Sequence, residues 1–490
     1  MAANFERRML IFGLLAFIIP VAARAQALPV QNLHLSLEEP VYAGLPVWIK
    51  ADLAYPYEAR YPYSEDPSDF GPNVIELRRG NEVIQPRSFP LFGNSPGSGI
   101  MGGSAAPPNA PQNRLPLHLK YHIEQPGTYS VEWTAVRQVL VGKHQMNAVA
   151  GRSDWLAFEV KPSTPEQREA WLEKTLAAVP TDPGPLVGDS LPSLLVASPD
   201  PRVLRTVLEH LYSKDPLVGG YALSSLGLFH ADDLRAPALE LMHLRGLSEQ
   251  MAYLLSWHPQ FQDSREELLR AALPYLQSSD DKQVAATLQL LGWVAHPAKA
   301  SWTADSDIPG RTDRAVLAVA PSLLKRDGDA PRMLALYLGG IKSDESRGLL
   351  WQLAGRTGSG HTQALIVLTW IGDDRDLPRL SEQLWKPGDA DIYGRDLTSL
   401  PYGLMHGYGD RATPYLEHAI SASPYVFVRT ESAEQLILKQ RPAAVAFFLD
   451  AIENQRSYKR ELVQWLVDHC GLPPDSDDQA AIAFLKSRMR

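Results

Sequence analysis

The sequence predicts a chain in two parts, an antiparallel β-sandwich followed by an array of short α-helices. Two observations predict it. Residues 28–161 alternate apolar and polar side chains between turn signals, which is typical of strands. Residues from about 199 onward repeat apolar side chains at spacings of three and four, which is typical of helices. With 490 residues, the chain is too long for one ordinary core, so we expect several domains or a repeat array.

The first 25 residues have the pattern of a cleavable signal peptide. Arg7 and Arg8 supply positive charge, an apolar run occupies 9–21, and Ala-Arg-Ala at 23–25 is a small-x-small cleavage motif. The apolar run is too short for a comfortable membrane span, and no later segment is long and apolar enough for one. We expect cleavage after Ala25 and a mature chain that is periplasmic or secreted.

Charge and cysteine content exclude several classes of partner. The formal charge is −9, from 47 Lys and Arg against 56 Asp and Glu. An acidic chain without basic clusters repels phosphate backbones and anionic lipid, so we expect neither nucleic acid nor a membrane surface as partner. Cys470 is the only cysteine, which rules out a disulfide within the chain. We interpret it as a packing residue near a helix end, with a reactive thiol as the alternative.

The part at 26–161 is expected to be the sandwich. The alternating stretches lie at 33–37, 46–53, 74–78, 83–84, 115–123, 126–133 and 155–160. The stretches at 74–78 and 83–84, joined by a turn at 79–82 that contains Gly80, predict a hairpin. The Pro-Gly-Thr-Tyr sequence at 126–129 resembles the penultimate strand of bacterial immunoglobulin-like domains. This resemblance implies an immunoglobulin-like sandwich in which Tyr129 anchors a corner. A macroglobulin-like or fibronectin-like sandwich fits equally well.

Two segments of this part are expected to be loops. Seven prolines at 86–116, mixed with glycines, predict one long loop. The other contains Tyr-Pro-Tyr twice, with rings at Tyr55, Tyr57, Tyr61 and Tyr63. Rigid amphipathic rings displayed together can stack on sugars or dock a partner. The alternative is that they seal the open end of the sandwich.

A boundary with a helix start follows the sandwich. Thr164 can cap a helix at 166–179, and Pro165 suits its first turn. We interpret 162–198 as a linker that contains this one helix, because four prolines follow at 180–192.

From 199 to 490 the helices recur in pairs. The clearest pair lies at 364–384, where a helix ends at Gly372, an acidic turn follows, and Pro378 opens a second helix. Glycines at 227, 292, 339, 372 and 409 mark the ends of similar first helices. The Leu-Gly, Asp and Pro-x-Leu signature resembles the HEAT family of α-solenoids, which implies a curved array used mostly for binding. We interpret the acidic turn at 373–376 as a helix-capping device.

Two insertions break the repeat, at 295–311 with Trp302 and at 386–400 with Tyr393. Each begins like a calcium loop, but lacks a carboxylate at the fifth position and the glutamate at the twelfth. His118 and His122 would lie about 13 Å apart on a strand, too far to share a metal ion. We therefore predict no metal site, no cofactor and no catalytic residue. The predicted binding residues are Tyr55, Tyr57, Tyr61, Tyr63, Trp302 and Tyr393.

These observations favour an exported, non-catalytic scaffold that binds another protein through an α-solenoid surface. The alternative is an exported enzyme, or a binding module, that acts on glycans or peptides of the cell envelope. An enzyme would need paired carboxylates in a concave, partly dry site, and the acidic tyrosine loop gives no sign of one.

Overall fold

The computed structural model describes residues 31–52, 74–87, 114–141, 144–257, 261, 264–296, 307–356, 358–386, 397, 399–473 and 476–487. The predicted signal peptide and most of the loop at 86–116 lie outside these residues.

The described N-terminal residues form one mixed β-sheet around a long strand, β7. The strands are β1 (Gln31–Leu37), β2 (Val41–Tyr42), β3 (Trp48–Asp52), β4 (Val74–Arg79), β5 (Glu82–Ile84), β6 (Arg114–Pro116), β7 (Gly127–Val141), β8 (His144–Ser153) and β9 (Leu156–Lys161). Their order is β2-β9-β7-β8-β1-β3-β6, and β4 pairs with β5 and β7. Most pairs are antiparallel, but β1 runs parallel to β8 and β2 parallel to β9. A β-rich region is confirmed, whereas a purely antiparallel sheet is wrong for these two pairs.

The alternation of β7 builds the core of the sheet. Tyr129, Val131 and Trp133 are all buried, and they pack in one cluster with Leu77 of β4. The Tyr129 hydroxyl donates to the Gln125 carbonyl at 2.9 Å, which ties the start of β7 to the preceding turn. The predicted hairpin is confirmed, because Arg79 pairs with Glu82 across a turn in which Gly80 has φ of +58°.

The alternating stretch at 115–123 is not the strand that it predicts. Its first residues belong to β6, and α1 (Leu117–Lys120) follows as a single helical turn. Leu117, His118 and Leu119 are all buried, so alternation in this stretch does not separate a wet face from a dry one. When successive side chains are all buried, the pattern of apolar and polar residues no longer distinguishes a strand from a helix.

The rest of the described chain is helical. The helices are α2 (Pro165–Ala177), α3 (Pro183–Pro185), α4 (Leu191–Leu194), α5 (Pro201–His210), α6 (Pro216–Ser225), α7 (Ala231–Arg245), α8 (Glu249–Trp257), α9 (Arg265–Ala272), α10 (Asp281–Ala295), α11 (Ile308–Leu323), α12 (Asp329–Ile341), α13 (Asp344–Ala354), α14 (Ser359–Ile371), α15 (Leu377–Glu382), α16 (Ser399–Tyr408), α17 (Thr413–Ala422), α18 (Val426–Ile437), α19 (Pro442–Glu453), α20 (Lys459–Cys470) and α21 (Asp478–Ser487). Among described residues, none of them is long and apolar enough to cross a membrane.

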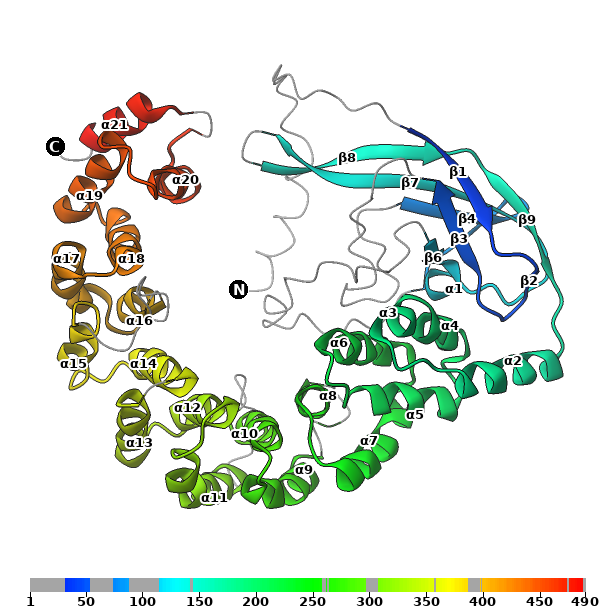
Figure 1. Ribbon diagram of the computed structural model, residues 1–490, viewed down its shortest axis with the longest axis horizontal. Helices are drawn as coiled ribbons and strands as arrows, with labels where there is room; N and C mark the ends of the chain where they lie inside the picture. Colours follow the sequence, from blue (N-terminus) through cyan, green and yellow to red (C-terminus); the bar gives the residue numbers. More distant parts are fainter. Residues whose placement is uncertain are drawn as a thin grey trace, which may run out of the picture.

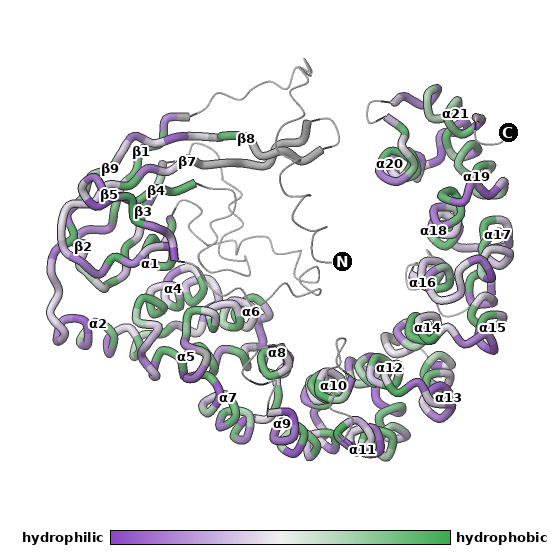
Figure 2. Tube along the Cα trace, turned by 180° about the vertical axis from the view of Figure 1, so that it is seen from behind, coloured by the Kyte–Doolittle hydropathy of each residue, from purple (hydrophilic) through white to green (hydrophobic). Residues whose placement is uncertain are grey.

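These helices form an open arc with two rows (Figure 1). The even-numbered helices from α6 to α20 form the inner row, and the odd-numbered helices from α5 to α21 form the outer row. Each inner helix packs against the next inner helix along the arc. Figure 2 shows apolar residues on helices all along both rows. Their buried side chains form one continuous cluster from Leu119 to Leu485. A core that runs along the array is what stacked repeats produce, so the helical-repeat prediction is confirmed.

Helix starts follow the predicted cap chemistry in several places. Thr164 and Gln167 form a reciprocal capping box at α2, with Pro165 as the first helical residue. At α5 and α6 the Asp200 and Asp215 carboxylates accept from N–H groups of the first turn, and each aspartate is followed by Pro.

The repeated glycines have a different role from the one predicted. Gly372 does end α14, with φ of +68°, but Gly292 and Gly339 lie inside α10 and α12. A Cβ on Gly339 would come 2.5 Å from Val367 Cγ1 of α14, and one on Gly407 of α16 would come 1.9 Å from the Thr369 carbonyl oxygen of α14. Glycine therefore allows successive inner helices to approach closely, which is why it recurs.

His118 joins the sheet to the helices. It is fully buried, Nδ1 accepts from the Val47 N–H at 3.1 Å, and Nε2 donates to the Pro192 carbonyl at 2.9 Å. The Trp48 ring lies edge-on to the imidazole at 5.7 Å, and Arg114 stacks over Trp48 at 3.8 Å. Burial lowers the pKa of His118 to about 4, so the ring is neutral at physiological pH.

We expect the contact that His118 makes between the sheet and the helices to weaken in acid. Between about pH 6.5 and 4 the unfolded chain binds a proton that the folded chain excludes, so the free energy of unfolding falls by about 3 kcal/mol as pH drops through this window. His118→Ala should lower stability at pH 7.5 and remove this part of the pH dependence. Urea unfolding at pH 7.5 and 4.5 measures both effects. His122→Ala is the control, because that side chain is 63% exposed. Equal pH slopes for His118→Ala and the unsubstituted protein would contradict this account.

Candidate functional site

All six predicted binding residues, Tyr55, Tyr57, Tyr61, Tyr63, Trp302 and Tyr393, lie outside the described residues. They remain predictions. The described residues do show which surface the array leaves open.

The inner row carries one exposed aromatic side chain on each of three successive helices. They are Trp370 on α14, Tyr402 on α16 and Phe427 on α18, with exposed fractions of 56%, 55% and 40%. We call these three residues the aromatic row. Large exposed aromatic rings are unusual on a soluble surface when they recur on neighbouring elements, and they are enriched where proteins bind one another.

Helix packing explains where the aromatic row points. Each inner helix is covered by inner neighbours on two sides and by outer helices behind, so its open side faces the inside of the arc (Figure 1). On α14 the least buried positions include Ile366 and Trp370, four residues apart, while Leu365, Leu368 and Thr369 are buried. On α16 the exposed positions Tyr402 and His406 have the same spacing, and their rings stack at 6.1 Å. Residues four apart share one helix face, so the aromatic row belongs to the concave face.

The concave face stays partly apolar toward the middle of the array. Tyr253 of α8 and Trp293 of α10 are both half-buried, and their rings lie 6.1 Å apart. Leu336 of α12 is half-buried as well. An apolar surface that continues across several helices suits an extended partner better than a compact small molecule.

Carboxyl groups lie at the end of the aromatic row. Burial and the neighbouring carboxylates of Glu431 and Glu461 raise the pKa of Glu434 on α18 to about 8. Burial also raises the pKa of Glu431, whose Oε1 accepts from Gln435 at 3.0 Å. Glu434 is therefore mostly protonated at neutral pH, and the pair carries less negative charge than its composition suggests.

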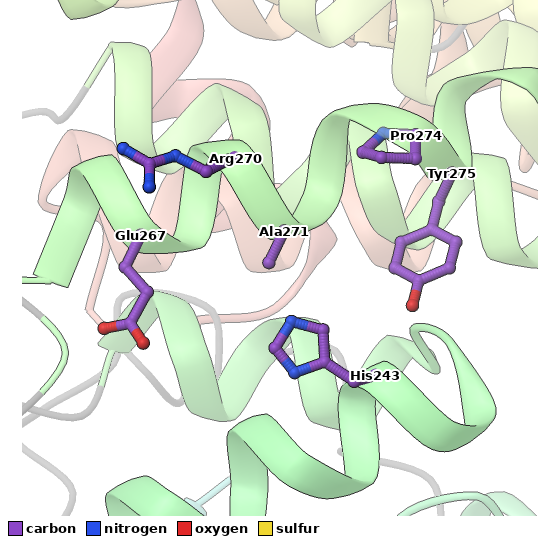
Figure 3. A pocket seen from close by; sticks show the side chains of 6 residues that line it. All are labelled: His243, Glu267, Arg270, Ala271, Pro274 and Tyr275. Carbon is purple, nitrogen blue, oxygen red and sulfur yellow. The ribbon is translucent and has the colours of Figure 1, made fainter.

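The outer row has a pocket large enough for a small ligand, but its polar side chains are not placed to bind one. It has a volume of about 340 Å³ between α7 and the end of α9. Figure 3 shows His243 on one side and Glu267, Arg270 and Tyr275 on the other. The polar groups are already engaged, because Glu267 pairs with Arg235 at 2.6 Å and the Tyr275 hydroxyl donates to the Met242 carbonyl at 2.9 Å. Arg270 points away from His243 in Figure 3, so no set of free polar groups converges on this space.

A histidine and an aspartate meet where the first insertion begins. His296 Nε2 lies 2.8 Å from Asp313 Oδ1, and the Tyr337 hydroxyl donates to the same oxygen at 2.8 Å. The pair links α10, α11 and α12. With the aspartate oxygen shared by the imidazole and the phenol, the cluster is interpreted as a structural link between helices.

The described part of the chain contains no candidate metal-binding site. No group of three or more His, Cys, Asp or Glu side chains is placed there to hold an ion. His122 lies at the surface beside Glu124, whereas His118 is buried at the joint. Cys470 is half-buried at the end of α20 and forms no disulfide.

Sequence reasoning missed the aromatic row. Trp370, Tyr402 and Phe427 lie in helices whose apolar residues mostly pack against neighbouring repeats, so the sequence does not single them out. The signal was present in the spacing, because Trp370 falls outside the stripe formed by Leu365 and Leu368.

The chain matches no family model and no curated protein. A solved structure described as a crystal structure of an engineered protein, from the Northeast Structural Genomics Consortium, shares 14% sequence identity with it. The match covers 67% of this chain and 91% of the other, with a TM-score of 0.28. A likeness at this level carries no argument about fold or function.

Proposed function

We propose that this is an exported, non-catalytic scaffold that binds another protein along the concave face of its helical array. The aromatic row of Trp370, Tyr402 and Phe427 is the observation that carries the proposal. Burying three such rings in an interface supplies a large part of the free energy of a specific complex, because aromatic residues dominate binding hot spots. Export rests on the signal-peptide pattern at 1–25, with cleavage after Ala25 and a periplasmic or secreted mature chain.

We also propose two family-level fold assignments, one for the helical array and one for the N-terminal sheet. A HEAT-like array is supported by the paired helices, by the continuous core and by Pro at the start of many helices. An immunoglobulin-like origin of the N-terminal sheet is supported by Tyr129, whose hydroxyl reaches back four residues to a backbone carbonyl as in a tyrosine corner.

The test is retention of a partner by the mature protein and by matched variants. Trp370→Ala/Tyr402→Ala/Phe427→Ala should reduce affinity for a partner captured from an envelope extract by at least about 100-fold, because each hot-spot ring contributes about 1–2 kcal/mol or more. Leu244→Ala is the control, because Leu244 is 66% exposed on the outer helix α7. Tyr57→Ala/Tyr61→Ala tests the tyrosine loop in the same assay.

Equal retention by the triple variant and the unsubstituted protein would contradict a concave binding surface. Loss of retention in the Tyr57→Ala/Tyr61→Ala variant alone would move the site to the tyrosine loop. The alternative functions are an enzyme or a binding module for envelope glycans or peptides. A signal on a glycan array or a hydrolase panel, with no protein retained, would favour them.

A further inference from the structure

One face of α18 joins the aromatic row to a pair of buried carboxyl groups. Phe427, Glu431, Glu434 and Leu438 follow one another at spacings of four, three and four residues, which places them on one side of the helix. We call these four residues the α18 stripe. Leu438 is 50% exposed and Phe427 is exposed as well, whereas Glu431 is half-buried and Glu434 is only 9% exposed. The two carboxyl groups therefore lie between exposed apolar side chains on the concave face.

The carboxyl pair of the α18 stripe has no cationic partner within the described part of the chain. No Lys, Arg or His there forms an ion pair with Glu431, with Glu434 or with Glu461 of the adjacent helix α20. By contrast, the buried Asp376 carboxylate is paired with Arg347. A carboxyl group taken out of water without a cation keeps its proton. The pair therefore offers a place for positive charge that the described chain does not fill.

The neighbouring helices supply no positive charge either. Burial, and after it the carboxylates of Glu431 and Glu461, raises the pKa of Glu434, and no cation of α16, α17, α19 or α20 opposes this shift. Helices α14 and α16 contain no Lys or Arg. The titratable side chain that α16 presents to the concave face is His406, stacked on Tyr402. This end of the concave face is therefore apolar and acidic, which complements a partner that is apolar and basic.

An extended segment of a partner can reach from the aromatic row to the carboxyl pair. Packed helices lie about 8–10 Å apart, so the two steps from Trp370 on α14 to the α18 stripe cover on the order of 20 Å. An extended chain rises about 3.3 Å per residue, so about six residues span this distance. The aliphatic stem of a lysine or arginine can pack on Phe427 and Leu438 while its charged head reaches the carboxyl groups. The face of an aromatic ring also attracts a cation.

We propose that the protein partner of the concave face presents an extended apolar segment with a lysine or arginine, and that this cation pairs with the Glu431 and Glu434 carboxyl groups. The inference rests on the proposed scaffold function and names the chemistry of its partner. Binding breaks the O–H bond of Glu434 and passes the proton to the buffer, because the entering cation takes over its role. Since the pKa of Glu434 is about 8 before binding, affinity should rise as pH rises from about 6 to about 8.

Two synthetic peptides test the inference on the full chain. Each has about nine residues, long enough to span the distance, and alternates leucine with serine. One carries arginine at both ends, and the other carries the neutral isostere citrulline there. We expect the arginine peptide to bind about tenfold more tightly in fluorescence anisotropy, because only arginine supplies a charge-assisted contact. Titration calorimetry near neutral pH, in two buffers of different ionisation enthalpy, should show that the arginine peptide alone releases up to about one proton.

Glu434→Gln separates the charge of this residue from its packing, because glutamine has the shape of the protonated carboxyl group but takes no negative charge. It should weaken the arginine peptide about tenfold and leave the citrulline peptide unchanged. Unchanged binding of the citrulline peptide shows that the variant is folded and that its apolar surface is intact. Glu453→Gln is the matched control, because that side chain is 46% exposed on the outer helix α19.

Equal dissociation constants for the two peptides would overturn the inference, and so would an undiminished preference for arginine in Glu434→Gln. Absence of binding by both peptides overturns it as well. The proposed function fails by a different result, because it predicts that Trp370→Ala/Tyr402→Ala/Phe427→Ala loses the captured protein whatever charge that protein carries.

Discussion

Gly407→Ala is expected to destabilise the helical array by about 3 kcal/mol, whereas Gly348→Ala is expected to be neutral or stabilising by up to about 1 kcal/mol. The first Cβ would lie 1.9 Å from the Thr369 carbonyl oxygen, a backbone atom that cannot move aside without shifting α14. The second would meet nothing within 4 Å on α13, so alanine there only improves helix propensity. The two substitutions are chemically identical, and they differ only in what the new methyl group meets.

Thermal and urea unfolding of both variants measure the difference. The unfolding transition of Gly407→Ala should move to lower temperature and lower denaturant concentration, and that of Gly348→Ala should stay in place or rise. Equal stability of the two variants would mean that α14 and α16 do not cross as closely as described.

Asp376→Ala is the second substitution with a large expected effect, about 3 kcal/mol of lost stability. Asp376 is 1% exposed and accepts from Arg347 Nε at 2.6 Å and from the Trp351 indole at 2.8 Å. Removing it leaves the Arg347 guanidinium, only 20% exposed, with no carboxylate closer than Asp373 at 3.9 Å. Asp374→Ala is the control, because its carboxylate is 69% exposed and pairs with Arg411 at the surface.

A double-variant cycle makes this test sharper. Arg347→Met in the Asp376→Ala background should restore part of the lost stability, because it removes the charge that has lost its partner. Additive losses in urea unfolding, or an Asp376→Ala effect no larger than that of Asp374→Ala, would contradict the role assigned to this pair.

The acidic turn at 373–376 is a case in which the sequence predicts the position of a feature but not its role. Its position between two helices was correctly predicted from the apolar spacing on either side. Its role was not, because Asp376 makes no side-chain cap at α15. Instead Asp376 binds Arg347 of α13, Arg375 binds Asp344 at 2.8 Å, and Asp374 binds Arg411. These partners stand about 30 residues or more away in the chain, so only the stacking of repeats brings them within reach.

Separation along the chain also explains which other features the sequence predicts and which it does not. Local signals predicted the hairpin at Gly80 and the helix cap at Thr164, since each depends on residues a few positions apart. The parallel pairing of β1 with β8 could not be predicted, because the two strands are joined by more than 100 residues of intervening chain. The aromatic row depends on which face of each inner helix stays open, and the order of packing decides that.

Site-specific photo-cross-linking tests the concave binding surface most directly. A photoreactive residue placed at 402 on the inner helix α16 should cross-link one defined protein partner from an envelope extract, and Trp370→Ala/Phe427→Ala should suppress that product. The same residue placed at 244 on the outer helix α7 should give no such product. Cross-linking of the same partner from position 244 but not from 402 would contradict binding inside the arc.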